Sequence, residues 1–247
     1  MPSELRLGHD VILSALSCAY FPSQETVCIS DLHLGYELYM ESEGVFLPRL
    51  QVKLEMERME NILQHYRPAR IVINGDLKQE FGRSSPQEWI EIRRLFEFLL
   101  SKTKVVVVRG NHDNYLLSIA SKFDIGVVDS YKAGDILFAH GDILIDRKDA
   151  ALIVIGHEHP AIRVRDAVGA QVKFPAFLYL ASTNVLVLPA FSPFAAGVDA
   201  ISESETFMSP FLHSMEPNTT AVFAIAGGEI RRVGTISDIR AVSEIYF

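Results

Sequence analysis

The sequence has few cysteines, few basic residues and no long hydrophobic run. Its 247 residues include two cysteines, Cys18 and Cys28, both in apolar stretches. This argues against a disulfide-held secreted domain, and we expect reduced thiols packed in the core of a cytoplasmic protein. Lysine and arginine number 23 against 31 aspartates and glutamates, a formal net charge of -8. This argues against a protein that coats nucleic acid electrostatically, although a local positive site is compatible with it.

The longest candidate for a membrane or signal segment is the apolar stretch of residues 11–21. It is too short to cross a bilayer, and it follows a start that mixes acidic and basic residues. We therefore predict a strand there. The apolar C-terminal half is interrupted by prolines and glycines, so no membrane helix and no membrane partner are expected.

The composition and its periodicity predict one α/β domain over residues 1–247. Hydrophobic residues make up 49% of the chain, which is enough to bury a full core. Short runs rich in valine and isoleucine are typical of buried strands, and they occur at residues 26–30, 70–74, 104–108, 135–139 and 152–155. Amphipathic spacing and capping residues predict helices over 49–66, 86–102 and 115–122. This order predicts mixed sheets with helices outside them.

The second half of the chain changes to short strands and turns. Residues 189–219 contain prolines at 189, 193, 210 and 217 and predict a long loop packed by its own phenylalanines. We expect this loop to edge a substrate cleft. Strands return at 221–225 and 230–233.

Each of the five short apolar runs is followed by residue types that bind metals. The segments are DLH at 31–33, GD at 75–76, GNHD at 110–113, HG at 140–141 and GHEH at 156–159. Ligands of open α/β sheets bind outside the carboxyl ends of the strands, so these side chains are expected to converge. Residues two apart in an extended segment point to the same side, which suits the first and last segments. Glycines at 75, 110 and 156 allow sharp turns and close approach.

The candidate ligands are two carboxylates, one amide and four imidazoles: Asp31, Asp76, Asn111, His33, His140, His157 and His159. Seven candidates exceed the needs of one tetrahedral zinc ion. Nitrogen and oxygen donors without thiolate favour two divalent ions such as manganese, iron, cobalt, nickel or zinc. Two such ions need a bridging oxygen ligand and clamp the attacking and leaving oxygens of a displacement at phosphorus.

A charge count favours a phosphate ester as the substrate. Two dications bring about +4, two carboxylates about -2 and a bridging hydroxide about -1, so the pocket is positive inside an acidic protein. The predicted reaction is in-line attack on phosphorus by metal-bound hydroxide.

The order of the motifs, D-x-H, G-D, G-N-H-D, H and G-H-x-H over residues 31–159, resembles the calcineurin-like metallophosphoesterase superfamily. The segments DLHLGYE, GVFLPR, GDLKQEFG and VRGNHDN are similar to those of the small archaeal-type, ICC-like phosphoesterases related to SbcD nucleases. The resemblance implies a four-layer α/β sandwich. In this fold two mixed β-sheets are flanked by helices, and the metal site lies at the carboxyl ends of the strands.

The resemblance also implies a role for each site residue. One metal would be bound by Asp31, His33 and His159, the other by Asn111, His140 and His157, and both by the bridging Asp76. His112 would bind no metal and would act as the catalytic residue that stabilises the transition state or protonates the leaving oxygen. Many relatives orient this histidine with an acidic residue three positions after the bridging aspartate. This chain has Gln79 there and Glu80 next, so the partner of His112 is open.

Three functions are compatible with the residues. The first is a phosphoesterase with two divalent metal ions, manganese being expected first, and the resemblance favours phosphodiesters of a small molecule or nucleotide. The second is a DNA nuclease of the SbcD-related type. The acidic charge argues against it, and so do the 88 residues after His159, which leave little room for a capping domain. The third, a noncatalytic scaffold, is disfavoured because every ligand and the histidine are kept. An oligomer is compatible with the sequence but not specified by it.

The remaining polar residues near the motifs have simpler expected roles. We expect Asp113 to cap the helix that follows it. We expect Lys78 and Arg109 to be solvated, with a phosphate contact as the alternative. His9, lying outside the motifs, is expected to be an ordinary residue, as are His65 and His213.

Overall fold

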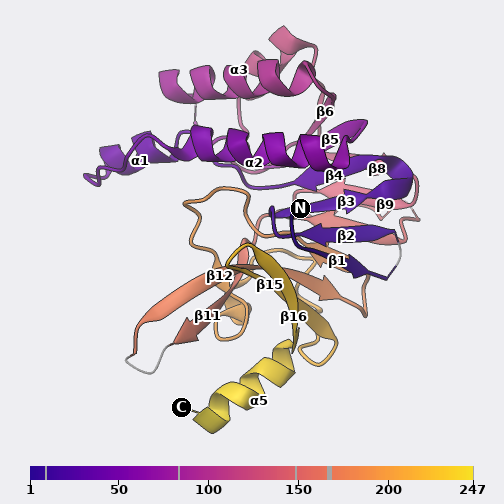
Figure 1. The fold of residues 1–247 in the computed structure, drawn as a ribbon. Helices are drawn as coiled ribbons and strands as arrows, with labels where there is room; N and C mark the ends of the chain where they lie inside the picture. Colours follow the sequence, from indigo (N-terminus) through magenta and orange to yellow (C-terminus); the bar gives the residue numbers. More distant parts are fainter. Residues whose placement is uncertain (9, 83, 148, 166–168, 247) are drawn as a thin grey trace.

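The computed structural model describes residues 1–8, 10–82, 84–147, 149–165 and 169–246. Two mixed β-sheets lie face to face, and helices cover the outer face of the first sheet (Figure 1). This confirms the predicted α/β fold with two mixed sheets.

The first sheet has seven strands among the described residues, paired in chain order. They are β1 (Glu4–Leu7), β2 (Val11–Ser14), β3 (Cys18–Phe21), β4 (Thr26–Ile29), β5 (Arg70–Asn74), β6 (Lys104–Val108) and β7 (Val127–Val128). Strands β1 to β4 pair antiparallel, whereas β4 to β7 pair parallel. The parallel strands end at one edge, as a shared site requires.

The second sheet has nine strands in the described part of the chain. Seven follow the order β14 (Val198–Asp199), β11 (Pro160–Arg165), β12 (Gln171–Leu180), β13 (Val185–Val187), β10 (Leu152–Ile155), β9 (Ile136–Ala139) and β8 (Ser130–Ala133). β15 (Thr220–Ala226) pairs with β12, and β16 (Glu229–Thr235) pairs with β15. β9 and β10 pair parallel, so their carboxyl ends also coincide.

The helical layer packs on the first sheet through one apolar core. It contains α1 (Tyr36–Ser42), α2 (Gln51–Tyr66), α3 (Pro86–Leu100), α4 (Leu117–Ala120) and the 3-10 turn η2 (Ser121–Phe123). Met59 of α2 and Phe96 of α3 are fully buried in this core. The predicted capping box is present at α3, where Ser85 accepts from the Glu88 amide and the Glu88 carboxylate accepts from the Ser85 amide.

A second core joins the two sheets, and a third covers the outer face of the second sheet. Between the sheets, the rings of Phe21 and Phe138 meet edge to face at 5.3 Å. The third core is covered by residues 200–212 and by the start of α5 (Ile236–Tyr246). A loop segment and helix α5 therefore form the layer outside the second sheet.

Several local predictions need correction. Residues 11–21 form the two strands β2 and β3 rather than one, because Ser17 adopts a left-handed turn conformation with φ of 56°. Residues 189–219 contain β14 and the 3-10 turn η3 (Ser204–Thr206). The helices α1 and α5 and the turn η1 (Pro22–Gln24) were not predicted. Both cysteines are buried and unbridged, as expected.

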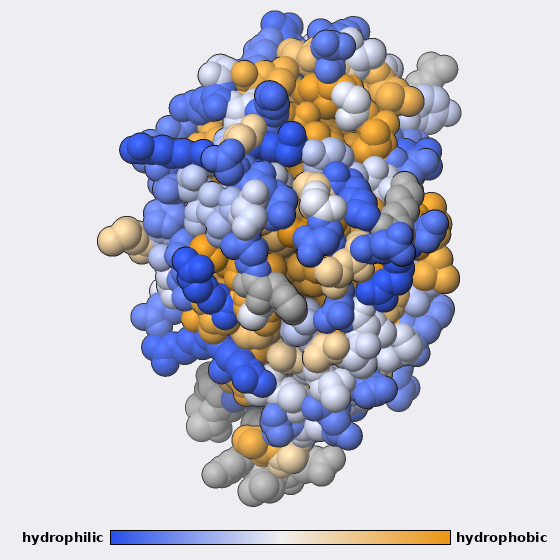
Figure 2. Space-filling model, turned by 90° about the vertical axis from the view of Figure 1, so that its right-hand side faces the viewer, coloured by the Kyte–Doolittle hydropathy of each residue, from blue (hydrophilic) through white to orange (hydrophobic). Residues whose placement is uncertain are grey.

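The surface does not present one continuous apolar face in the view of Figure 2, where polar and apolar residues are interspersed. Within the described residues, no helix has the length and apolar character that a membrane crossing requires.

The core between the sheets is expected to carry much of the stability. Replacing the fully buried Phe138 by alanine should lower the free energy of unfolding by about 3 to 5 kcal/mol, because a cavity is left beside Phe21. The control is Phe46→Ala, since Phe46 is 79% exposed and its loss should change stability by at most about 0.5 kcal/mol. Urea unfolding followed by circular dichroism measures both. Equal losses would contradict this packing.

Candidate metal centre

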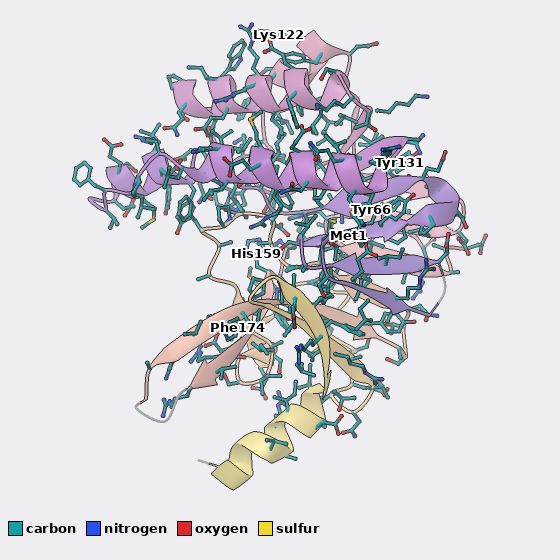
Figure 3. All side chains as sticks on the ribbon, in the orientation of Figure 1. Met1, Tyr66, Lys122, Tyr131, His159 and Phe174 are labelled. Carbon is teal, nitrogen blue, oxygen red and sulfur yellow. The ribbon has the colours of Figure 1, made fainter. Side chains whose placement is uncertain are left out.

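The loops after β4, β5, β6, β9 and β10 meet at one place and bring all the predicted ligands together. His159 lies in the middle of the molecule, between the layer that contains α2 and the second sheet (Figure 3). Three groups of side chains could each hold a metal ion: Asp31, His33 and His159; His33, Asp76 and His112; and Asp76, His140 and His157. Within each group the donor atoms lie within 4.8 Å of one another.

The first group joins the loop after β4 to the loop after β10. His159 Nε2 lies 3.2 Å from Asp31 Oδ1 and 3.2 Å from His33 Nε2. The His33 ring reaches Asp76 Oδ2 at 3.9 Å. Asp76 is thereby within reach of the first group as well as the second.

The second group is built around His140. His140 Nε2 lies 3.3 Å from Asp76 Oδ2, 3.1 Å from Asn111 Oδ1 and 3.2 Å from His157 Nδ1. The other ring nitrogen, Nδ1, donates to the Asn74 carbonyl at 3.1 Å. This bond occupies Nδ1, so Nε2 is the nitrogen that would bind a metal once its proton is lost.

Opposite charges and burial compete at this centre. Burial opposes the charge of Asp76, but the hydrogen bond and charge of His140 lower its pKa. Burial also opposes protonation of His140, yet the hydrogen bond and charge of Asp76 raise the pKa of His140 to about 10. His33 differs, because burial and then the charge of His159 lower its pKa to about 4.

His112 is oriented by a main-chain carbonyl. Its Nδ1 donates to the Gln79 carbonyl oxygen at 2.5 Å, and its Nε2 lies 3.9 Å from Asp76 Oδ2. The Phe81 ring packs on the imidazole with centroids 3.7 Å apart. The Gln79 carbonyl therefore takes the place of the acidic side chain that the resemblance led us to seek.

The ligand loops adopt left-handed backbone conformations rather than the extended ones that we expected. Five candidates have positive φ: Asp31 at 60°, His33 at 51°, Asp76 at 49°, His157 at 68° and His159 at 44°. Such a conformation costs roughly 1 to 2 kcal/mol for an ordinary residue and clusters at functional sites. Asp31 and His33 do face the same site, as do His157 and His159, but left-handed turns rather than extended segments bring them there.

Close approach explains the glycines of the motifs. A Cβ at Gly156 would collide with Ser30 Oγ and lie 2.6 Å from Asp31 Oδ2. A Cβ at Gly110 would collide with the Asp76 carboxylate. Larger residues there would displace candidate ligands, as the sequence predicted.

Three positioning residues were not predicted. Asn74 donates from Nδ2 to the Ala139 carbonyl at 2.7 Å. Gln51 donates from Nε2 to the carbonyls of Leu32 and His33 at 2.7 and 2.9 Å. Asp113 was wrongly expected to cap a helix, since its carboxylate accepts from the Leu77 and Gly110 amides, both at 2.9 Å.

Two cations near the motifs and one histidine outside them have protein partners. Lys78 Nζ donates to the Gly82 carbonyl at 2.9 Å, and Arg109 pairs with Asp129 at 3.0 Å. His65 pairs with Glu4 at 2.7 Å, His213 is exposed, and His9 lies outside the described residues.

The donor set fits a pair of divalent metal ions. Imidazole, carboxylate and amide donors converge without a thiolate, and His33 and Asp76 each belong to two of the three groups. The ring nitrogen Nδ1 of His33 is buried without a hydrogen-bond partner. Such a set suits borderline divalent ions.

Gly156→Ala is expected to reduce metal binding. The added methyl group must push Ser30 and Asp31 away, so we expect at least tenfold weaker binding of manganese, measured by equilibrium dialysis. Gly126→Ala is the matched control, because nothing lies within 4 Å of its Cβ position. Equal affinities for the two variants would contradict the close approach.

Metal binding is expected to release protons. With a pKa of about 10 in the metal-free protein, His140 is protonated at pH 8, whereas a ligand imidazole must be neutral. Calorimetry at pH 8 in two buffers of different ionisation enthalpy should show about one proton released, and affinity should fall as the pH falls. Identical heats in both buffers would contradict this prediction.

Comparisons with known proteins agree with the geometry. The profile of the calcineurin-like phosphoesterase family matches residues 25–163. A comparison with curated proteins gives no match.

The solved structures similar to this chain include a nuclease and a phosphoesterase. The nuclease MPE of Pseudomonas putida is 19% identical, with a TM-score of 0.67, over 94% of this chain and 100% of that chain. YfcE, a phosphoesterase from E. coli, is 14% identical, with a TM-score of 0.40, over 86% of this chain and 93% of that chain. The first similarity shows the fold. The family match covers more than half of the chain and all the converging loops, so the chain belongs to the calcineurin-like phosphoesterase family of metal-dependent phosphoesterases.

Proposed function

We propose that this protein hydrolyses phosphodiesters with two divalent metal ions. One ion would be held by Asp31, His33 and His159, the other by Asn111, His140 and His157, and both by Asp76. The observation that carries the proposal is the position of Asp76 between the two sets of donors, since its Oδ2 lies 3.9 Å from His33 Nε2 of the first set and 3.3 Å from His140 Nε2 of the second. When bound, the ions would activate water as the nucleophile and neutralise charge on the phosphate oxygens.

His112 is the proposed catalytic residue. Its Nδ1 is committed to the Gln79 carbonyl, so Nε2 is the atom that can exchange a proton with the substrate. Nε2 lies on the Asp76 side of the ring, next to the proposed metals. A proton given from Nε2 to the leaving oxygen would complete the displacement.

The positions of the neighbouring groups support this role. The Glu88 carboxylate accepts from the amides of Gln79 and Glu80 at 3.1 and 2.7 Å. It thereby fixes the turn whose carbonyl orients His112. The Asp76 carboxylate accepts from the His112 amide at 2.9 Å, which joins the two motifs directly.

The finer parts of the proposal rest on the motifs. The preference for diesters follows from the similarity to ICC-like, SbcD-related phosphoesterases. Manganese is the metal proposed first, with iron, nickel, cobalt and zinc as alternatives. A single domain over residues 1–247 and a cytoplasmic location also belong to the proposal.

A second candidate function is DNA cleavage. It is favoured by the similarity of the whole chain to a nuclease, although that similarity concerns the fold. The net charge of -8 argues against a long duplex track. Incubation with plasmid and with single-stranded DNA in manganese distinguishes the two, because a diesterase for small substrates leaves both intact.

The roles of Asp76 and His112 are separable. Asp76→Asn should abolish hydrolysis of bis-p-nitrophenyl phosphate and reduce metal content, because the common ligand loses its charge. His112→Gln should lower kcat about 100-fold or more while the metal content stays the same, as expected for a general acid.

The matched control is His213→Ala, since His213 is exposed and lies outside the motifs. Its kcat should equal that of the wild type. A His112→Gln enzyme with undiminished kcat would contradict the catalytic role, and a fully active Asp76→Asn enzyme would contradict the shared ligand.

A further inference from the structure

A cavity of about 450 Å³ lies beside the metal centre, with His159 in its wall. Its other walls are formed by α2, by the starts of β11 and β12, and by residues 190–197. Its volume is in the range of small-molecule sites. Most of the lining is proline, alanine and glycine, and two cationic residues, Arg58 and Lys173, belong to it.

The loop wall of the cavity is bonded directly to the candidate ligand segments. The amides of Phe191 and Ser192 donate to the carbonyls of Ser30 and Asp31 at 2.8 and 3.1 Å. At the other end, the Val198 amide donates to the His159 carbonyl at 3.0 Å. A group held in the cavity would therefore lie at a fixed position relative to the metals.

The two cations of the cavity differ in their partners. Lys173 donates to the Gly197 carbonyl at 2.7 Å and lies 3.7 Å from a Glu203 carboxylate oxygen. Arg58 donates from Nη1 to the Phe191 carbonyl at 2.7 Å and packs on the ring of Phe191. Among the described residues, no carboxylate oxygen lies within 4.0 Å of the Arg58 guanidinium.

The acid almost one turn before Arg58 on α2 forms no ion pair with it. Glu55 is buried and accepts from Gln51 at 3.0 Å instead of pairing with the arginine. A guanidinium has five N–H donors, so several remain for a ligand. An unpaired arginine in a partly enclosed apolar cavity favours an anion, and its planar fork suits phosphate.

We propose that this cavity binds a second phosphate group of the substrate, one nucleoside away from the phosphate that is hydrolysed. Arg58 would contact that phosphate, and the proline and alanine walls would pack against the sugar between the two. This inference rests on the proposed phosphodiesterase function. It makes the substrate a nucleotide or short oligonucleotide rather than a diester with a single phosphate group.

Two pairs of matched substrates test whether the negative charge of the second phosphate group matters for hydrolysis. We would use thymidine that carries a p-nitrophenyl phosphate ester at the 5′ oxygen and, at the 3′ oxygen, either an anionic methyl phosphate or a neutral methyl methylphosphonate. A second pair has the two positions exchanged. Release of p-nitrophenol reports the same bond in every case. We expect the wild type to show at least tenfold higher kcat/KM for the anionic member of at least one pair.

Variants of the cavity test whether Arg58 is the residue that recognises the second phosphate. Arg58→Gln should reduce the ratio of the anionic to the neutral kcat/KM to below 2, and Arg58→Lys should restore part of it. Ala195→Glu places a negative charge in the wall without removing the arginine and should also abolish the preference, whereas Ala195→Gln should retain it. Arg93→Gln is the control, because Arg93 is an exposed residue paired with Glu97 on α3.

The outcomes separate this inference from the proposed function. A wild-type enzyme that hydrolyses bis-p-nitrophenyl phosphate but shows no preference in either pair would overturn the second phosphate site and favour an uncharged group in the cavity. A preference that survives in both Arg58→Gln and Ala195→Glu would also overturn it. Wild-type protein with bound metal and no activity on any diester would contradict the proposed function itself.

Discussion

The carboxyl edges of the two sheets are bonded together at Asn74, the last residue of β5, and the metal centre depends on this junction. The Asn74 side chain donates to Ala139 in β9 at 2.7 Å and to Val154 in β10 at 3.2 Å. Its carbonyl accepts from Ser30 Oγ at 2.8 Å and from His140. Apolar packing alone would allow the sheets to slide, whereas a buried amide with these partners fixes their relative position.

Holding the ligand loops at this junction costs free energy, and the charges of the metal centre offset part of that cost. Five candidate ligands take left-handed backbone conformations, and two carboxylates are buried within a cluster of imidazoles. In the absence of cations, the carboxylates favour the protonated forms of His140 and His159, which is why the pKa of each is raised in spite of burial. Divalent ions would supply the same charge without those protons. Metal binding and the stability of these loops are therefore linked.

The sequence predicts those parts of the fold and the site that depend on local patterns. Five valine-rich and isoleucine-rich runs became β4, β5, β6, β9 and β10, and the residues after each of them converge. The helices α2 and α3 follow from their amphipathic spacing and from the capping box at Ser85. The hairpin at Ser17 was missed because its turn has neither glycine nor proline.

The residues that support the site were missed for a different reason. Asn74, Gln51 and Arg58 have ordinary positions in a strand or a helix, and their importance comes from partners more than 15 residues away. No local pattern marks such residues. The partner of His112 could not be predicted either, because the group that orients it is the Gln79 backbone carbonyl, and every residue carries such a carbonyl.

The most direct test is a crystal structure of the protein with manganese, with anomalous scattering measured at the manganese edge. Two peaks about 3.5 to 4 Å apart, with Asp76 between them, are predicted. The remaining neighbours of the peaks should be Asp31, His33, His159, Asn111, His140 and His157. A single peak, peaks at other positions, or no peak in a crystal of active protein would contradict the dinuclear centre.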